Sequence, residues 1–356
     1  MTGRRLLVAA AALALVAATA PPTLDRLFPR GLAPISLGST PEVDASAKPC
    51  AACHPAESAE WTASRHSLAW TNGIFQREFK REPLDWCVRC HAPLATGDAS
   101  SVNNVTSEGV NCAVCHLRDG TMLAASKRAN SPHNTVAVPG FGSSAYCAGC
   151  HQFEFPVIDE DHQVRGYTDW PMQSTVAEFR AGALVSHAGE CYGCHGDTPG
   201  GHRFPGGHEL DALQHALDLD ICRLPRGTLR LTLTNAAAGH GVPTGDVHRA
   251  LRLRAWRSTD PERLVETYFG RAFEPVPESQ GKRVRLDTTI APLASRSWIV
   301  DPAKLGGERG EAVNVELRYI YTADEEPTAR NDPGEPTKAI VDSRRFNPEE
   351  EPPCPP

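Results

Sequence analysis

The stretch Gly109-Val-Asn-Cys-Ala-Val-Cys-His116 places two cysteines and a histidine within five positions, at Cys112, Cys115 and His116. The same C-x-x-C-H spelling occurs five times in this chain of 356 residues and uses ten of its twelve cysteines. At the cysteine and histidine frequencies of the sequence, chance would give roughly 0.02 copies. The repetition therefore reflects a chemical requirement that the whole N-terminal half of the chain shares.

The five copies lie between residues 50 and 195. Their paired cysteines are Cys50 and Cys53, Cys87 and Cys90, Cys112 and Cys115, Cys147 and Cys150, and Cys191 and Cys194. The histidines that follow the second cysteine are His54, His91, His116, His151 and His195.

Covalent attachment of c-type haem explains this pattern. Each thiol would add to a vinyl group of the haem, and two intervening residues let one turn of chain reach both vinyl positions. The next histidine then becomes the proximal iron ligand. A zinc site has no need of a histidine after every cysteine pair, a thioredoxin-like dithiol occurs once, and disulfides need no histidine. The sequence therefore predicts five covalently bound c-type haems.

The N-terminus indicates export. Arg4 and Arg5 form a basic head, and an apolar run follows from Leu6 to Ala20. This is the pattern of a secretory signal peptide and is short for a membrane span, although an uncleaved N-terminal anchor remains the alternative. We expect residues 1–20 to be the signal, residues 21–48 to be a linker or arm, and the protein to be periplasmic or extracellular.

The spacing of the motifs and the later sequence predict an α+β chain with two domains. Attaching a haem to every 30 residues or so would let haem faces supply much of the core, which agrees with an aromatic content of 6%. We expect a pentahaem domain of short helices and loops over 49–222, with a helical turn just after each motif. An antiparallel β-sandwich-like domain should follow over 223–322, and an acidic, proline-rich, loosely attached tail over 323–356.

The β domain is predicted from period-two alternation. Residues 228–234, 251–255 and 313–321 alternate apolar and polar side chains cleanly, and 284–286 and 297–300 are weaker candidates. Short strands separated by Pro, Gly and Asp turns are typical of an antiparallel sandwich.

Each haem iron has a second axial position, and nine histidines outside the motifs could fill it. His66 follows the first motif after a helix-like stretch, and His133 lies in a turn after the third. His202 and His208 flank a Pro-Gly-Gly kink, and His240 lies in a tight Gly/Pro loop between predicted strands. These five are the candidate distal ligands, whereas His162, His187, His215 and His248 are expected to be surface residues. Met122 and Met172 are expected to be packing residues rather than ligands.

The same stretches resemble the multihaem c-type cytochromes related to cytochrome c554, especially an exported pentahaem branch with a C-terminal β domain. The resemblance runs from Cys50 to the 300s and is carried by the following segments: Trp61 to His66, Glu108-Gly-Val-Asn-Cys112, Cys150-His-Gln-Phe153, Met172 to Phe179, His202 to His208 and Gly239 to Gly245. It implies distal ligation by His66, His133, His202, His208 and His240, and leaves the physiological reaction open.

These observations favour an exported electron carrier that conducts along closely spaced, mostly bis-histidine haems between a redox donor and a redox acceptor. One alternative is a reductase or oxidoreductase of a small nitrogen or sulfur compound at one haem with an open site, and another is a subunit of an extracellular cytochrome assembly. No nucleotide loop or hydrolytic triad is evident, so we expect a carrier rather than an enzyme.

Two features remain outside this scheme. The net charge of −7 and the lack of clustered basic residues argue against a nucleic-acid partner. Cys222 and Cys354 lie outside the motifs and could form an internal disulfide, an intermolecular bridge or two free thiols.

Overall fold

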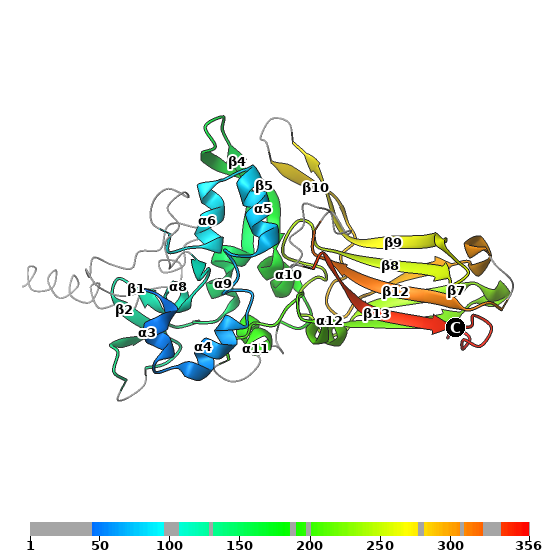
Figure 1. Cartoon of the computed structure of the whole chain (residues 1–356), viewed down its shortest axis with the longest axis horizontal. Coiled ribbons are helices and arrows are strands. Elements are labelled where there is room, and N and C mark those ends of the chain that lie inside the picture. Colours follow the sequence, from blue (N-terminus) through cyan, green and yellow to red (C-terminus); the bar gives the residue numbers. More distant parts are fainter. Residues whose placement is uncertain are drawn as a thin grey trace, which may run out of the picture.

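A computed structural model describes residues 45–95, 107–127, 131–185, 190–196, 201–276, 281–306, 310–322 and 336–355. The expected signal 1–20, most of the expected arm 21–48, His187 and part of the expected tail lie outside these ranges. The described residues form a helical N-terminal part and a β-rich C-terminal part that follow each other along the long axis (Figure 1). This confirms the α+β class. Within the described ranges, no helix is long and apolar enough to cross a membrane.

The N-terminal part is built from short helices. They are α3 (Ala47–Ala51), α4 (Pro55–Thr62), α5 (Gly73–Arg81), α6 (Asp85–His91), α8 (Cys112–His116), α9 (Ser144–His151), α10 (Thr175–Ala181) and α11 (Glu190–His195). Every C-x-x-C-H motif lies on or at the end of one of them, and four of these helices end at the motif histidine itself.

The helical turn is therefore formed by the motif rather than by the residues after it. Within the described ranges, the first motif alone is followed directly by another helix, α4. After the third and fourth motifs, Leu117 and Gln152 adopt extended backbone and begin the strands β1 (Leu117–Arg118) and β4 (Gln152–Ile158). The expectation of a helical turn after each motif is wrong at these two sites, because an extended residue at the C-cap directs the chain into a sheet.

Two small sheets complete this part. In the first, β1 pairs antiparallel with β2 (Thr121–Ala124), and β2 pairs parallel with β3 (Thr135–Ala137). The second is an antiparallel hairpin of β4 and β5 (Val164–Ser174), whose register shifts three times. Such short or irregular pairings give no alternation in the sequence, and none of them was predicted.

The C-terminal part consists of two antiparallel sheets (Figure 1). The larger has the strand order β10 (Lys282–Asp287), β9 (Asp260–Pro275), β8 (Ala250–Arg257), β12 (Val313–Ile320) and β13 (Lys338–Phe346). The smaller has the order β11 (Ser295–Val300), β7 (Leu229–Asn235) and β6 (Leu217–Arg223). The short helices α12 (Leu210–Ala216), η1 (Pro225–Gly227) and η2 (Pro302–Leu305) lie before or between strands.

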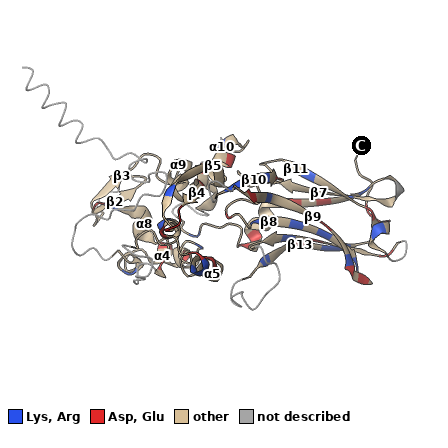
Figure 2. Ribbon diagram, turned by 90° about the horizontal axis from the view of Figure 1, so that it is seen from above, with Lys and Arg blue, Asp and Glu red and all other residues tan. Residues whose placement is uncertain are grey.

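Alternating leucines of both sheets form the core of this part. Leu229, Leu231 and Leu233 of β7 are fully buried, as are Leu251 and Leu253 of β8. Each buried leucine contributes about 1.5–3 kcal/mol relative to an exposed one. Basic and acidic residues are interspersed along the strands of this part (Figure 2). The β7, β8 and β12 strands occur where alternation predicted them.

Three strands lie where the sequence did not predict them. β6 begins at Leu217, inside the segment expected for the haem domain, and β13 comes from the expected tail. β9 is the longest strand, although it begins at Asp260-Pro261 and contains Gly270. Most of its side chains are partly or fully exposed, so the sequence shows little alternation of apolar and polar residues. Backbone pairing with a strand on each side, β8 and β10, holds it in the sheet.

Cys222 of β6 and Cys354 form an internal disulfide. Backbone hydrogen bonds flank it, since the Arg223 amide donates to Pro352 and the Cys354 amide donates to Arg223. Together with β13, the disulfide attaches residues 338–354 to the sandwich, so this part of the expected tail is an integral element.

Candidate haem-binding centres

The cysteine pairs have the arrangement that haem attachment requires. All ten motif cysteines are free thiols. On a helix, residues three apart lie on one face, so α6, α8, α9 and α11 each present their two thiols together, with the motif histidine one position later. We number the centres 1 to 5 in chain order, with proximal histidines His54, His91, His116, His151 and His195.

Four of the five proximal histidines face a second histidine. The distances between ring centres are 6.3 Å for His54 and His133, 6.1 Å for His116 and His202, 6.3 Å for His151 and His66, and 6.2 Å for His195 and His240.

These distances match two imidazoles on opposite sides of one metal ion. A ring nitrogen lies about 1.1 Å from the ring centre and metal–nitrogen bonds are about 2.0–2.1 Å, which together give about 6.3 Å between centres. Four similar values at four separate sites are not expected from packing alone. The side chains of centres 1, 3, 4 and 5 therefore fit an iron between two histidines.

Hydrogen bonds orient several of these rings. A backbone carbonyl can only accept, so the ring Nδ1–H donates and Nε2 stays available for a metal. The Nδ1···O distances are 2.7 Å for His91 and Ala69, 2.9 Å for His116 and Leu123, 2.7 Å for His195 and Pro205, and 2.9 Å for His240 and Gly241.

Burial keeps the rings of centre 4 neutral. The pKa of His66 is lowered to about 4, first by burial and then by His151 and His195. Burial, followed by His195 and His240, also lowers the pKa of His151 to about 4. A neutral imidazole is the form that binds a metal, so the environment favours the ligating state at physiological pH.

Centre 2 differs from the other four. Among the described residues, no histidine ring faces His91. Its Nδ1 donates to the Ala69 carbonyl, and the Phe75 ring stacks on it with 3.7 Å between ring centres and 7° between planes. Burial lowers the pKa of His91, whereas the Asp246 carboxylate raises it. The His91 ring is therefore oriented by a hydrogen bond and a stacking contact, but no described histidine faces it.

His208, one of the five candidate distal ligands, lies elsewhere. It stacks on Tyr321, with 4.3 Å between ring centres and 5° between planes, and its Nε2 is 3.0 Å from an Arg249 nitrogen. Its sequence context resembles that of His202, six residues earlier. The two separate because Phe204, between them, has a positive φ of 50° and turns the chain.

The remaining candidates that the structure describes lie outside the four histidine pairs. His162 is in the turn between β4 and β5, His215 is on α12, and His248 is in the loop before β8. Met122 packs in a small cluster beside the third motif, and Met172 packs beside Cys87 and Cys90.

The five centres adjoin one another. Thiols of different motifs are hydrogen-bonded at three places: Cys50 with Cys112, Cys90 with Cys150, and Cys147 with Cys191. These contacts connect centre 1 with 3, centre 2 with 4, and centre 4 with 5.

Centres 3 and 4 are connected by other side chains. The Tyr146 hydroxyl donates to the Cys115 carbonyl at 2.8 Å. The Phe204 ring lies 4.7 Å from His66 and 6.1 Å from His202. All five centres thus form one continuous group in which centre 4 has three neighbours.

Carboxylates that the sequence analysis did not single out as site residues hold these segments together. Glu108 accepts from the Ala47 amide and the Asn111 side chain, which joins the first and third motifs. Glu190 accepts from the Ser144 amide at 2.8 Å and so joins α11 to α9. Both lie shortly before the first cysteine of a motif, Glu108 four residues before Cys112 and Glu190 directly before Cys191.

Glu178 of α10 supports His240 from across the two parts of the molecule. Its carboxylate accepts from the Gly241 amide at 3.1 Å and pairs with Arg271 of β9 at 2.5 Å. Both side chains are mostly buried, with 15% and 14% exposed. The loop that presents His240 to His195 is therefore anchored to the helical part.

Comparisons with known proteins agree with this arrangement. The family described as "Cytochrome c554 and c-prime" matches residues 49–117. The fold is similar to that of a penta-heme cytochrome c552 from Thermochromatium tepidum, with a TM-score of 0.63, 19% sequence identity, and coverage of 85% of this chain and 98% of that one. No curated protein matches the chain.

Proposed function

We propose that the chain is a multihaem c-type cytochrome related to cytochrome c554, and that it carries electrons between redox proteins along five covalently attached haems. The haem supplies reversible one-electron chemistry when bound. The chain's own residues hold each haem through two thiols, orient the axial histidines and exclude water from the rings.

The four histidine pairs carry this proposal. Two histidines on one iron fill both axial positions and leave no place for a substrate, which suits electron transfer. Proximal histidines His54, His116, His151 and His195 would be paired with His133, His202, His66 and His240 as distal ligands. His208 is not proposed as a ligand, because its ring contacts Tyr321 and its Nε2 contacts Arg249.

The contacts between centres support a route for electrons. Centres 1, 3, 4 and 5 would form the main path, and centre 2 would branch from centre 4. The ends of the path reach the surface: the His54 side chain is 53% exposed, and Cys53 and Cys194 are exposed. We propose that donor and acceptor proteins dock near centres 1 and 5.

The cellular setting is part of the same proposal. The apolar N-terminal segment, residues 6–20, and the attachment of c-type haem outside the cytoplasm both support a periplasmic or extracellular location. Assembly with other cytochromes is compatible with exposed terminal centres.

Centre 2 supports a second candidate function. Among the described residues, no histidine ring faces His91, whose own ring stacks on Phe75. A haem whose iron has an open position could bind a small nitrogen or sulfur compound, which would make this branch a reductase or oxidoreductase site. The carrier function uses centres 1, 3, 4 and 5 and does not depend on this activity.

Spectroscopy of the haem-loaded protein tests both functions. We expect five haems per chain, and low-temperature EPR should show four of them as low-spin bis-histidine centres. His240→Ala should convert one more haem to high spin, whereas His248→Ala, a neighbouring loop variant, should leave the spectrum unchanged. Unchanged spin states in His240→Ala would contradict the ligand assignment. If nitrite or hydroxylamine alters no haem signal, the second candidate is rejected and the carrier function stands.

A further inference from the structure

Phe204 has a backbone conformation that bulky residues rarely adopt. Its φ is 50°, and a positive φ is an outlier for a side chain of this size. Such a conformation persists where the surrounding structure over-determines it, and it is found where a side chain has to be held in one place. The neighbours of Phe204 show which groups this conformation holds.

The chain is fixed on both sides of Phe204. Before it, the His202 amide donates to the Glu60 carboxylate at 2.6 Å. After it, the Pro205 carbonyl accepts from the His195 ring at 2.7 Å. Because both neighbours are held by contacts with other segments, the turn at Phe204 has little freedom to relax.

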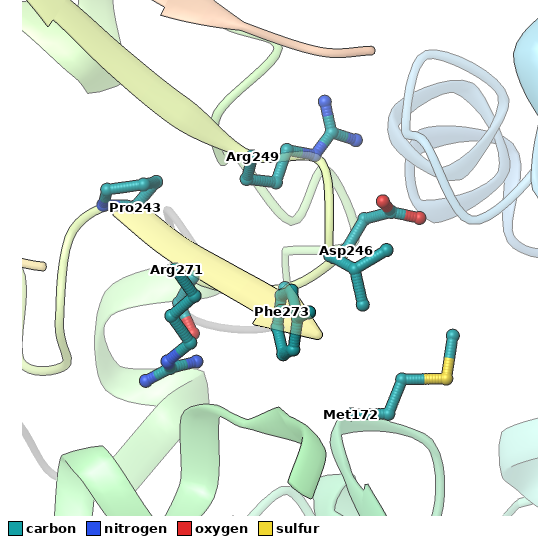
Figure 3. Close-up of a pocket in the computed structure, with 9 residues that line it drawn as sticks. Met172, Pro243, Asp246, Arg249, Arg271 and Phe273 are labelled. Carbon is teal, nitrogen blue, oxygen red and sulfur yellow. The ribbon is translucent and has the colours of Figure 1, made fainter. Parts of the chain in front are cut away.

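The far end of the same segment is anchored in the β part. His208 stacks on Tyr321, and its Nε2 lies 3.0 Å from the Nη2 of Arg249. The Arg249 amide donates to the Asp246 carbonyl at 3.1 Å, and the two residues line one small hollow before β8 (Figure 3). Residues 202–208 therefore run from the haem-binding centres to the sandwich, with the strained turn between the two ends.

The Phe204 ring contacts two candidate distal ligands. Its centre is 4.7 Å from that of His66, with 63° between the planes, and 6.1 Å from that of His202, with 82° between the planes. Both contacts are edge-to-face, a geometry that aromatic rings prefer. Since His66 faces His151 and His202 faces His116, one phenyl ring packs beside the distal histidines of centres 4 and 3.

This ring lies at a particular step of the proposed electron path. Thiol contacts connect centre 1 with 3, through Cys50 and Cys112, and centre 4 with 5, through Cys147 and Cys191. Among the described thiols, no hydrogen bond joins centres 3 and 4. At this step the Phe204 ring contacts a histidine of each centre.

We propose that Phe204 is a positioning residue that holds the distal histidines of centres 3 and 4 in place together. The inference rests on the proposed function, since it assumes that His202 and His66 bind iron in the loaded protein. The phenyl ring sets the orientation of both imidazoles, and the turn keeps the ring against them. Removing the ring therefore alters two haems at once, although Phe204 lies outside every motif.

The test uses low-temperature EPR of the haem-loaded full chain. The four low-spin signals of the wild type are measured first, and their absence would contradict the proposed function. His66→Ala and His202→Ala then assign the signals of centres 4 and 3, because each should convert one haem to high spin. If these two variants convert none, the ligand assignment fails before Phe204 is tested.

Phe204→Gly removes the ring and keeps the turn, because glycine adopts a positive φ without strain. We expect the signals of centres 3 and 4 to shift or to become partly high-spin, and those of centres 1 and 5 to stay unchanged. Centre 5 reports on the turn, since the Pro205 carbonyl orients His195. Phe204→Leu keeps part of the apolar volume and should give the same two changes at smaller size.

Two other phenylalanines provide matched controls. The Phe141 ring lies 5.2 Å from that of His116, so Phe141→Leu should alter the signal of centre 3 and no other. Phe155 pairs with Phe273 at 5.5 Å, and Phe155→Leu should alter no signal. Haem content shows that each variant folds and is loaded.

Three results would overturn the proposal: Phe204→Gly leaves the signals of centres 3 and 4 as in the wild type, it alters one of them alone, or it alters centre 5 as well. The last result would assign the effect to the turn rather than to the ring. If Phe204→Gly does not retain its haems, Phe204→Leu is judged by the same three results.

Discussion

At the scale of single residues, Gly109 shows how the third motif and His66, a proposed distal ligand, are joined. Its φ is +62°, and a Cβ at this position would lie 2.6 Å from the His66 carbonyl oxygen and 3.0 Å from the Ala69 amide nitrogen. The neighbouring Val110 amide donates to the same His66 carbonyl at 2.9 Å. Glycine is therefore needed here both for its backbone conformation and for space.

Replacing Gly109 with alanine should displace the segment that carries His66. We expect the free energy of unfolding to fall by about 1–3 kcal/mol, because the residue is strained and the clash is with backbone. We also expect one haem of the loaded protein to become partly high-spin, since His66 faces His151 at centre 4. Denaturant unfolding and EPR measure the two effects.

Gly149→Ala provides the matched control. It lies inside the fourth motif, where an added Cβ would meet nothing within 4 Å. The change converts Cys-Ala-Gly-Cys-His into the Cys-Ala-Ala-Cys-His of the first motif. If Gly149→Ala were as disruptive as Gly109→Ala, the contact with His66 would not be the cause.

At the scale of elements, the last described strand is held at two places. β13 pairs with β12 along its whole length and buries Val341 against the core. Eight residues beyond the end of β13, the disulfide joins Cys354 to Cys222 of β6, which belongs to the other sheet. The two sheets of the sandwich are thus connected covalently through the C-terminal segment.

The double variant Cys222→Ala/Cys354→Ala should destabilise the sandwich by about 2–4 kcal/mol, because the open chain gains conformational freedom when unfolded. Haem content and the low-spin signals should be unchanged at temperatures where the variant is folded, since neither cysteine belongs to a haem motif. Thermal unfolding by circular dichroism measures the loss. Equal melting temperatures for the variant and wild type would show that β13 alone secures the segment.

At the scale of the whole molecule, the β part completes a centre of the helical part. His240 comes from the loop between β7 and β8, and its ring lies 6.2 Å from that of His195, with 6° between the planes. Glu178 holds this loop through the Gly241 amide and the ion pair with Arg271. Docking of the two parts therefore brings His240 to His195, and the proposed ligation of centre 5 depends on it.

Glu178→Ala should weaken both the docking of the two parts and the proposed ligation of centre 5. Removing one partner leaves the Gly241 amide and part of the Arg271 charge unsatisfied, at a cost of about 1–3 kcal/mol. We expect a fraction of centre 5 to become high-spin, and Glu178→Gln, which keeps an acceptor for Gly241, to show a smaller effect. Glu160→Ala, an exposed position in the β4–β5 turn, is the control. A fully low-spin Glu178→Ala protein would show that His240 is held without the carboxylate.

The sequence by itself determined the attachment chemistry and the fold class. A C-x-x-C-H motif is a local unit: two cysteines and a histidine act within one helical turn, so their spacing is visible in the sequence. The strands β7, β8 and β12 were predicted for the same reason, because each buries alternate leucines, valines and similar side chains against one core.

Only the tertiary structure decided which candidate distal histidine faces which motif histidine, and that no described histidine faces His91 of centre 2. His66 lies 85 residues before His151, and His240 comes from the other part of the molecule, so their pairing depends on how distant segments pack. His202 and His208 look alike in sequence, but the turn at Phe204 directs one to His116 and the other to Tyr321 and Arg249. Local spacing fixes which residues can bind a haem, and long-range packing fixes which of them meet.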